Sequence, residues 1–492
     1  MSDQYEAAET GALRPVTLPI ESEAPAASER GLRALLAVTR EALTSAERDY
    51  TSGPIGRAVI LLAIPMVLEM VMESMFAICD VFFVSRLGVE AVAAIGLTEA
   101  LMTILYSVAG GIGMAVTAMV ARRIGEKRPD EAVSVTVQAI AVGLAVSLLI
   151  GIPGGLLAPR LLRVMGASAA VADLGAGYAT VMFGSSLTVV LLFMINAAFR
   201  GAGDAALAMR TLWLANGINL VLDPCLIFGL GPFPEMGLTG AAVATAIGRG
   251  AGVVYQLAAL LRGRGQLRVV RTQLRLRLSV IGQLLRVSVG GTMQYLVATA
   301  SWVALVRIVG GFGAAAVAGY TIAIRIIVFA LLPSWGLAGS AATLMGQNLG
   351  AGRPERAERS VWIAGVLNTV FLLAIAGIFV AAARPLVGIF TGDRDVLRFG
   401  VDCLRWVAYG YGFYGLGMVI VQAFNGAGDT TTPTVLNVAC YWLFQIPLAY
   451  VLAYRVGLGA TGAFIAIPVA ESVLTVASVL VFRRGRWKTV KV

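Results

Sequence analysis

The sequence predicts an all-α polytopic membrane protein with 12 transmembrane helices arranged as two parallel six-helix repeats. Three observations carry this prediction. Only 13% of the residues are charged and 58% are apolar, whereas soluble domains are about 25% charged. The apolar residues form twelve long blocks, and one motif recurs in the two halves at a constant spacing.

Each apolar block is long enough to cross a bilayer, which requires about 20 helical residues. The blocks contain frequent glycine, as packed membrane helices do, and they lack the two-residue alternation of a β-barrel strand. The blocks cover 58–84, 91–118, 133–157, 177–198, 207–229, 238–261, 285–309, 315–346, 361–382, 401–425, 432–454 and 461–482.

The second half repeats the first at a shift of 225 residues. AFRGAGD at 198–204 recurs as AFNGAGD at 423–429, and the same shift aligns Gly125 with Gly350. Because each half has an even number of spans, the halves enter the membrane from the same side and form parallel repeats. Bundles of this kind hold a substrate cavity between two lobes and work by alternating access.

The distribution of Lys and Arg predicts the orientation. Of the 32 basic residues after residue 57, 21 lie in one set of alternating loops and the C-terminal tail, and 7 lie in the opposite loops. The positive-inside rule therefore predicts a multi-pass protein of the inner cell membrane with both termini in the cytoplasm. The net charge of +10 then reflects topology, not nucleic-acid binding.

These boundaries divide the chain into five parts. A stretch within the first part, from Ser28 to Asp49, has the spacing of a short amphipathic helix. The parts are a polar cytoplasmic tail (1–53, partly disordered or amphipathic), an N-lobe (54–262), a basic cytoplasmic linker (263–284), a C-lobe (285–483) and a basic cytoplasmic tail (484–492).

Six acidic residues lie inside the predicted spans, where a charge costs about 2.5–3.5 kcal/mol or more at the helix centre. Five of them belong to the first half, and their repeat partners are neutral. Ion coupling is therefore expected in the N-lobe. The six are Glu69, Glu73, Asp80, Glu99, Asp223 and Glu471.

Helical geometry groups several of these residues. Glu69, Glu73 and Asp80 fall within about 40° on one face of the first span, just after Pro65, a candidate kink. In the fifth span, Asn216, Asn219 and Asp223 have the spacing i, i+3, i+7 and form a second polar stripe.

Depth brings five residues to one level of the membrane. Asp80 and Asp223 lie about four and six residues from the outer ends of their spans, and Thr245 lies about seven residues into the sixth. Tyr178 lies near the outer mouth of the fourth span, so that these four and Asn219 can meet. Two carboxylates in a low-dielectric medium favour a proton site or, with Asn and Thr oxygens, a sodium site. The alternative is interhelical hydrogen bonding that only holds the lobe together.

Five motifs together resemble exporters of the multidrug and toxic compound extrusion (MATE) family over about residues 54–483. The motifs are DVFFVSRLG at 80–88, AFRGAGD at 198–204, NLVLDPCLIFG at 219–229, GAAVAT at 240–245 and GQNLGAGRPERA at 346–357. The resemblance implies a MATE-like two-lobed fold that exports organic cations in exchange for H+ or Na+.

Within that family, the chain resembles the branch of the DNA-damage-inducible protein F group, which couples through the N-lobe. By this resemblance Asp80, Asn219 and Asp223 carry the cation, with Tyr178 and Thr245 as neighbours. Members of the norfloxacin-exporter branch add C-lobe acids on spans seven and ten. Here span seven has none, and span ten has only Asp402 near its outer end.

The substrate cavity is expected to carry an acidic wall, which favours cationic substrates by Coulomb attraction. We expect Glu73, Glu69, Asn216, Asn196, Gln294 and Tyr295 to line it.

The sequence thus predicts a secondary antiporter that exports small organic cations in exchange for H+ or Na+, by alternating access and with N-lobe coupling. The alternative is a lipid-linked saccharide flippase, for which Arg307, Arg325 and Arg405 would supply a cationic cavity. An enzyme is not expected, because the chain has no His and no evident nucleophile–base pair. We expect no cofactor or metal beyond the coupling ion, contact with membrane lipid, no nucleic-acid partner and a monomer.

Overall fold

The computed structural model describes residues 37–44, 48–263, 265–270 and 273–490, and these residues contain helices and loops but no strand. The prediction of an all-α membrane protein is confirmed. Leu32, Leu35 and Leu36 of the predicted amphipathic segment lie outside the described residues, and residues 37–42 of it are helical.

Twelve spans are found when each of two bent helix pairs is counted once, and ten helices cross alone. The N-lobe contains α2 (Ile55–Ser85), α3 (Val89–Gly125), α4 (Pro129–Val164), α5 with α6 (Ala169–Gly184, Ser186–Ala202), α7 (Ala205–Phe228) and α8 (Leu238–Arg262). The C-lobe contains α9 (Leu278–Gly310), α10 (Ala314–Gly350), α11 (Pro354–Gly388), α12 with α13 (Arg394–Tyr409, Tyr411–Ala427), the run α14–η2–α15–η3 (Thr431–Asn437, Val438–Gln445, Ile446–Tyr450, Val451–Arg455) and α16 (Ala460–Arg483).

Spans four and ten are broken, which the hydropathy pattern did not reveal. The α5–α6 pair bends by 42° and the α12–α13 pair by 60°. At Gly410, between α12 and α13, an added Cβ would lie 2.6 Å from the Cβ of Pro468, so the bend is filled by close packing of α16. By contrast, α2 continues through Pro65 as one helix.

Two boundaries differ from the sequence prediction. The helix α9 begins at Leu278, so residues 278–284 of the predicted linker are helical. The C-terminal tail is not a plain basic extension, because Arg486–Thr489 forms a 3-10 turn whose Trp487 is fully buried against Phe482. An aromatic side chain within a charged segment gave no periodic signal from which this packing could be read.

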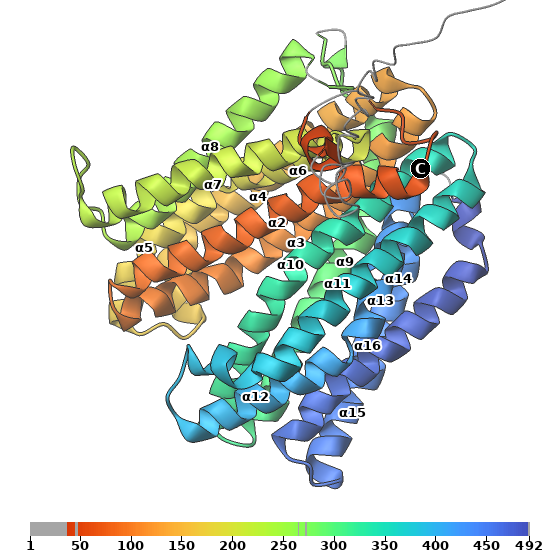
Figure 1. Ribbon diagram of the computed structural model, residues 1–492. Coiled ribbons are helices and arrows are strands. Elements are labelled where there is room, and N and C mark those ends of the chain that lie inside the picture. The colour runs from red at the N-terminus through yellow and green to blue at the C-terminus, as the bar shows by residue number, and fades with distance from the viewer. Residues whose placement is uncertain (1–36, 45–47, 264, 271–272, 491–492) are drawn as a thin grey trace, which may run out of the picture.

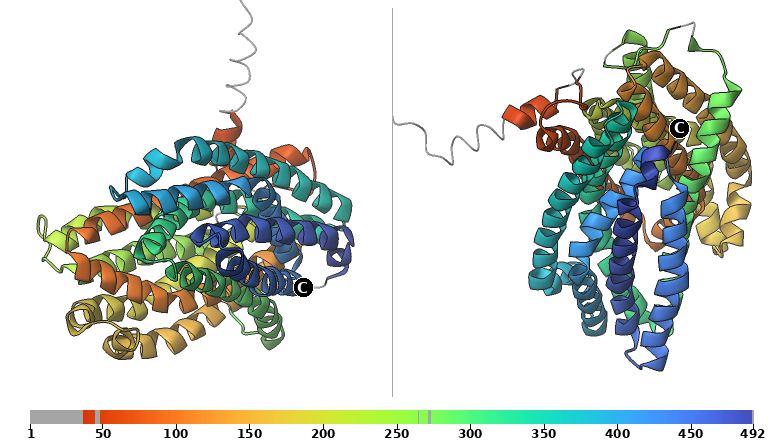
Figure 2. Two further views of the ribbon diagram at one scale, coloured as in Figure 1. Left: turned by 90° about the horizontal axis from the view of Figure 1, so that it is seen from below. Right: turned by 90° about the vertical axis from the view of Figure 1, so that its right-hand side faces the viewer.

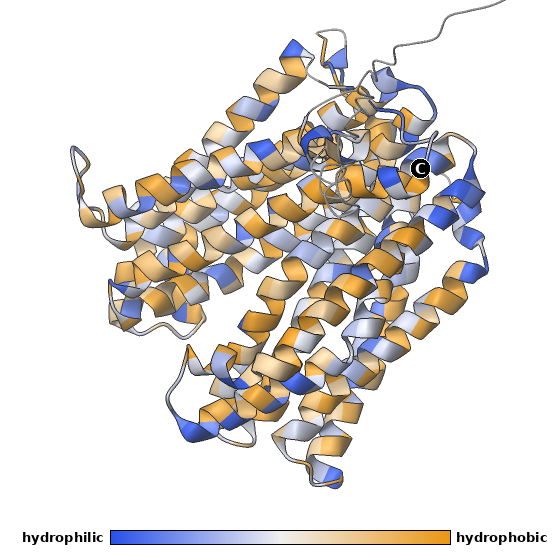
Figure 3. Ribbon diagram, in the orientation of Figure 1, coloured by the Kyte–Doolittle hydropathy of each residue, from blue (hydrophilic) through white to orange (hydrophobic). Residues whose placement is uncertain are grey.

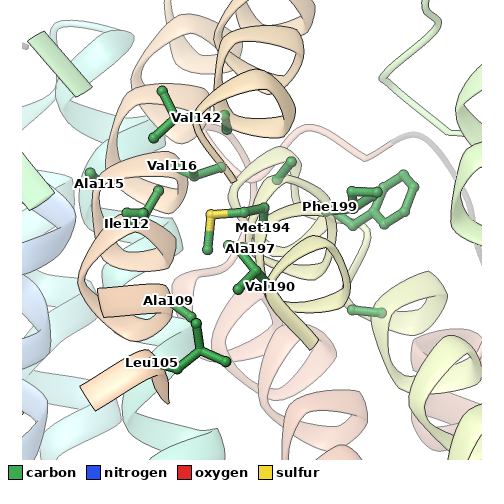
Figure 4. Close-up of a cluster of buried hydrophobic side chains, with 14 of the residues drawn as sticks. Leu105, Ala109, Ile112, Ala115, Val116, Val142, Val190, Met194, Ala197 and Phe199 are labelled. Atoms are coloured by element: carbon green, nitrogen blue, oxygen red, sulfur yellow. The ribbon is translucent and has the colours of Figure 1, made fainter. Parts of the chain in front are cut away.

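Apolar packing holds each lobe together. In the N-lobe, Leu105, Ala109 and Ile112 of α3 face Val190 and Met194 of α6 within one buried cluster (Figure 4). Farther along the same pair, an added Cβ on Gly201 of α6 would lie 2.8 Å from Thr117 O of α3. Such a small residue permits the close approach that replaces the hydrophobic drive lipid cannot supply.

The two lobes diverge along the bundle (Figures 1 and 2). Figure 3 shows apolar residues along most helices and hydrophilic ones gathered mainly at the loops. Arg122 and Lys127, at the α3–α4 loop, contact Val490 and Asp49, so both described chain ends lie there. We call this the basic end. The lobes are closed together at it, and they splay apart at the opposite, open end.

Reciprocal backbone contacts close the basic end. An added Cβ on Gly125 of α3 would overlap the backbone of Gln347, and one on Gly350 of α10 would overlap the backbone of Arg122. The two contacts are related by the 225-residue repeat. They therefore form a symmetrical crossing of α3 and α10 that tolerates only glycine.

The segment that precedes α2 ties both lobes at this end. The hydroxyl of Tyr50 donates to Gly203 O of the N-lobe (3.3 Å), and Arg356 of the C-lobe donates to Ser52 O (2.7 Å). Asp49 pairs with Lys127 at 3.3 Å, and a hydrogen bond from Thr51 lowers the pKa of Asp49 to about 2. The carboxylate is thus charged at any physiological pH, and this tie does not respond to pH.

We expect Gly125→Ala to destabilise the protein by about 1–3 kcal/mol, the usual cost of overpacking, because the crossing of α3 and α10 must separate. Thermal unfolding of the purified protein in detergent measures the change. Gly377→Ala in α11 is the matched control, since an added Cβ there meets nothing within 4 Å. Equal melting temperatures for the two variants would contradict the close backbone contact between α3 and α10 at Gly125.

Candidate ion-coupling site

A cavity in the N-lobe brings together three of the predicted coupling residues, Asp80, Tyr178 and Thr245. They come from α2, α5 and α8, and all lie toward the open end of their helices. Asp80 precedes the end of α2 at Ser85, and Thr245 follows the start of α8 at Leu238. The lining residues are Phe76, Asp80, Thr98, Glu99, Met102, Tyr106, Tyr178, Met182, Thr245 and Arg249.

Asp223 does not line this cavity, but hydrogen bonds through Asn219 and Thr245 connect it to the cavity wall. With its amide nitrogen toward Asp223, Asn219 donates to the carboxylate (2.8 Å) and its oxygen accepts from Thr245 N (2.9 Å) and Oγ1 (3.0 Å). The reverse orientation would set two oxygens against each other, so this orientation is favoured. Asp223 is fully buried, and its Oδ1 has no hydrogen-bond partner among the described residues. This oxygen is free to hold a proton or a cation.

Two charged residues in the cavity were not assigned a role from the sequence. Glu99 had been noted only as an acid within a span, and Arg249 had not been singled out. Arg249 donates to the hydroxyl of Tyr106 (3.3 Å) and lies over its ring, 6.0 Å from the centroid. Arg249 lies four residues, one helical turn, after Thr245, so the sequence places both residues on the same face of α8.

The predicted substrate residue Glu69 is paired inside the lobe. Arg200 of α6 donates to Glu69 Oε1 (3.0 Å), and Asn196 donates to the same oxygen (3.3 Å). Gln256 of α8 donates to Asn196 Oδ1 at 2.6 Å. Glu69 therefore anchors a network across α2, α6 and α8 and does not line the cavity as a bare carboxylate.

Glu73 and Asn216 form a second tie between α2 and α7, with the amide nitrogen donating to Glu73 Oε2 (3.0 Å). The indole of Trp213 donates to Leu68 O (3.1 Å) between the same helices. These ties lie on the basic-end side of Asp80. The part of α2 that carries Asp80 thus extends beyond its polar anchors.

The C-lobe repeats the Glu69–Arg200 pair in neutral form. At the 225-residue shift Glu69 becomes Gln294 and Arg200 becomes Asn425, and Gln294 donates to Asn425 Oδ1 at 2.9 Å. Its neighbour Tyr295 is 39% exposed and packs against Gly110 of the N-lobe. The six residues expected in one cavity are therefore divided between lobe interiors and the interface.

A bundle of membrane-spanning helices built from two parallel repeats is an architecture of membrane transporters. The family model described as MatE matches residues 65–225 and 292–451, one stretch in each lobe. The chain therefore belongs to the MATE family of multidrug and toxic compound efflux transporters and is not an enzyme.

Relatives of known name are similar over nearly the whole chain. The probable multidrug resistance protein YoeA of Bacillus subtilis is 24% identical, over 88% of this chain and 94% of that protein. The FAD transporter of Shewanella oneidensis is 26% identical, over 87% and 94% respectively. A solved multidrug resistance MATE transporter in its outward-facing conformation has a TM-score of 0.84 and 25% identity, over 89% of this chain and 98% of that one. None of these three is a saccharide flippase by name, so the comparison does not favour that alternative.

The stability of the Glu69–Arg200 pair can be tested by converting it into its neutral C-lobe counterpart. Arg200→Asn leaves Glu69 without its cation and should cost about 2 kcal/mol, less than the roughly 3–5 kcal/mol of a fully buried pair, because the Arg200 side chain is 26% exposed. Adding Glu69→Gln reproduces the C-lobe pair and should recover most of the loss. Chemical unfolding in detergent measures both. A double variant no more stable than Arg200→Asn would refute the structural equivalence of the Glu69–Arg200 and Gln294–Asn425 pairs.

Proposed function

We propose that this protein exports small organic cations in exchange for protons, and that the protons bind in the N-lobe at Asp80 and Asp223. The observation that carries the proposal is the continuous contact from the Asp80 cavity through Thr245 and Asn219 to Asp223. A single ion bound at either carboxylate therefore acts on α2, α7 and α8 together. The multidrug-resistance names of several relatives support the substrate class.

Arg249 favours H+ over Na+ as the coupling ion. It is a permanent cation within the same cavity as Asp80, since a guanidinium does not deprotonate in proteins. A sodium ion would have to bind beside it against Coulomb repulsion. A proton instead joins a carboxylate oxygen and needs no further ligands.

The charge of the N-lobe interior favours cationic substrates. Five carboxylates of the lobe's spans face two guanidiniums of the same lobe, those of Arg200 and Arg249. Arg325 of the C-lobe adds one more positive charge near Glu99. Even with Glu69 paired to Arg200, the interior keeps an excess of negative charge when the coupling residues are ionised. Substrate cations and protons then compete for the same negatively charged groups.

The exchange cycle follows from that competition. We infer that the protein lies in the inner cell membrane with the basic end in the cytoplasm, so the described conformation opens outward. Protons enter, neutralise Asp80 and Asp223, and release the substrate. The loss of charge changes the packing of α2 beyond its anchors at Glu69 and Glu73, and the protonated carrier turns inward.

The flippase alternative lacks its cationic cavity. Arg307, Arg325 and Arg405 are exposed and line neither the N-lobe cavity nor the cavity of the C-lobe. A pyrophosphate-bearing substrate would need such groups to converge.

Asp80→Asn should abolish drug-dependent dye efflux from cells, because an amide cannot take up and release a proton. The expression level and the melting temperature should stay near those of the unmodified protein. Asp402→Asn is the matched control, since Asp402 lies in α12 and lines neither cavity. Full export by Asp80→Asn would refute the coupling role of this carboxylate.

Everted membrane vesicles separate the two coupling ions. An imposed pH gradient alone should drive uptake of a fluorescent organic cation, and an imposed sodium gradient at equal pH should drive none. Collapse of the pH gradient by a protonophore should stop the uptake. Transport driven by sodium alone would reverse the assignment of the coupling ion.

A further inference from the structure

A second cavity lies inside the C-lobe, among α9, α10, the bent pair α12–α13, η2 and α16. Among the described residues that line it, Glu471 of α16 is the one charged residue. Its walls are rich in aromatic side chains, namely Trp302, Tyr320, Tyr411, Tyr414 and Tyr441.

This cavity occupies the same place in its lobe as the Asp80 cavity does in the N-lobe. At the 225-residue shift, Asp80 corresponds to Leu305 and Glu99 to Ile324, and each of these four residues lines its own cavity. Met102 and Ile327 are related in the same way. The repeat thus conserves the hollow and replaces both N-lobe carboxylates by apolar side chains.

At one equivalent position in the last helix of each lobe, the two side chains carry opposite charges. The helices α8 and α16 both follow a glycine with positive φ, Gly237 (54°) and Gly459 (62°), and a Thr-Gly-Ala sequence then begins one residue into each helix. Counted from these starts, Arg249 corresponds to Glu471. The N-lobe cavity therefore holds carboxylates with an internal cation, and the C-lobe cavity holds a carboxylate with no cation among its lining residues.

The polar groups of the C-lobe cavity are incompletely paired. Glu471 accepts a hydrogen bond from the hydroxyl of Tyr441 (3.0 Å), but a neutral donor does not balance a carboxylate charge within a membrane. The hydroxyls of Tyr320 and Tyr411, in side chains 3% and 1% exposed, have no hydrogen-bond partner among the described residues. Buried polar atoms are normally paired, so these two hydroxyls are available to bond to a ligand or a water molecule.

We propose that the C-lobe cavity binds the protonated amine of an organic cation. The ammonium group donates to Glu471, and its apolar body lies among the aromatic side chains, which attract cations through their ring faces. The hydroxyls of Tyr320 and Tyr411 bond to a polar substituent of the ligand. The proposal rests on the proposed function only for the class of substrate, organic cations.

A protonated amine fits these walls better than a metal ion. Hard metal ions take about six or more oxygen ligands, whereas the cavity presents one carboxylate among mainly aromatic and aliphatic side chains. An ammonium group needs only a carboxylate and aromatic faces. The free volume of the cavity is about 30 Å³, so the aromatic side chains must move apart to admit the apolar body of such a ligand.

Calorimetric titration of the purified full-length protein in detergent tests the site, with Asp80→Asn in the background to weaken cation binding in the N-lobe. The probes are phenethylammonium and its neutral analogue 2-phenylethanol, which has the same carbon skeleton. We expect the ammonium probe to bind at least about tenfold more tightly than the alcohol, and Glu471→Gln to remove that difference. Asp402→Asn, the control carboxylate of the C-lobe, should keep it. An unchanged preference in Glu471→Gln overturns the proposal.

A second variant keeps the test valid if Glu471→Gln does not fold. Tyr320→Phe combined with Tyr411→Phe should weaken binding of 4-hydroxyphenethylammonium by about threefold to tenfold and leave phenethylammonium unaffected. Equal affinities for the hydroxylated probe in both proteins overturn the assignment of the hydroxyls. These binding results do not depend on proton coupling. Loss of the C-lobe site would leave the Asp80 efflux result intact, and the reverse also holds.

Discussion

The cost of placing a charged or polar group in a membrane governs this structure. Most such groups find a partner within the bundle, because lipid offers none. Glu69 meets this requirement with Arg200 and Asn196, and Glu73 meets it with Asn216. The same contacts join α2 to α6 and α7. The polar groups thus hold the N-lobe together, and the part of α2 that carries Asp80 extends beyond them.

The repeat separates what the scaffold requires from what the chemistry requires. The close crossing of α3 and α10 uses Gly125 and Gly350 in equivalent positions, because either backbone contact fails with a side chain present. The pair Glu69–Arg200 has instead become Gln294–Asn425, which keeps a hydrogen bond and discards both charges. Backbone packing is therefore retained in both lobes, whereas charge has been free to differ. Under the proposed mechanism, such a division allows one lobe to bind the coupling ion without altering the shape of the other.

Hydropathy was sufficient to predict the twelve spans, because a bilayer imposes one length scale on every helix. Depth along the spans also brought Asp80, Tyr178 and Thr245 to one level, and the structure places these three around one cavity. Arg249 lies one helical turn from Thr245, but that spacing alone does not show whether the guanidinium enters the cavity or points to another span. The bend at Gly410 and the burial of Trp487 depend on packing against distant helices. Which acids become paired likewise depends on side chains of other spans, as Glu69 and Arg200 illustrate.

In the proposed cycle, the internal cation of the N-lobe suits a site that must empty at each turn. When Asp80 releases its proton, the negative charge remains within reach of Arg249 in the same cavity, so the empty state is not a bare charge in a low-dielectric medium. Glu471 has only the hydroxyl of Tyr441. A C-lobe site of this kind is costly to leave both ionised and empty, and it should exchange one cation for another or for a proton. In the proposed cycle, the N-lobe site can therefore empty as an ionised site beside Arg249, whereas the C-lobe site releases one cation only as another cation or a proton replaces it.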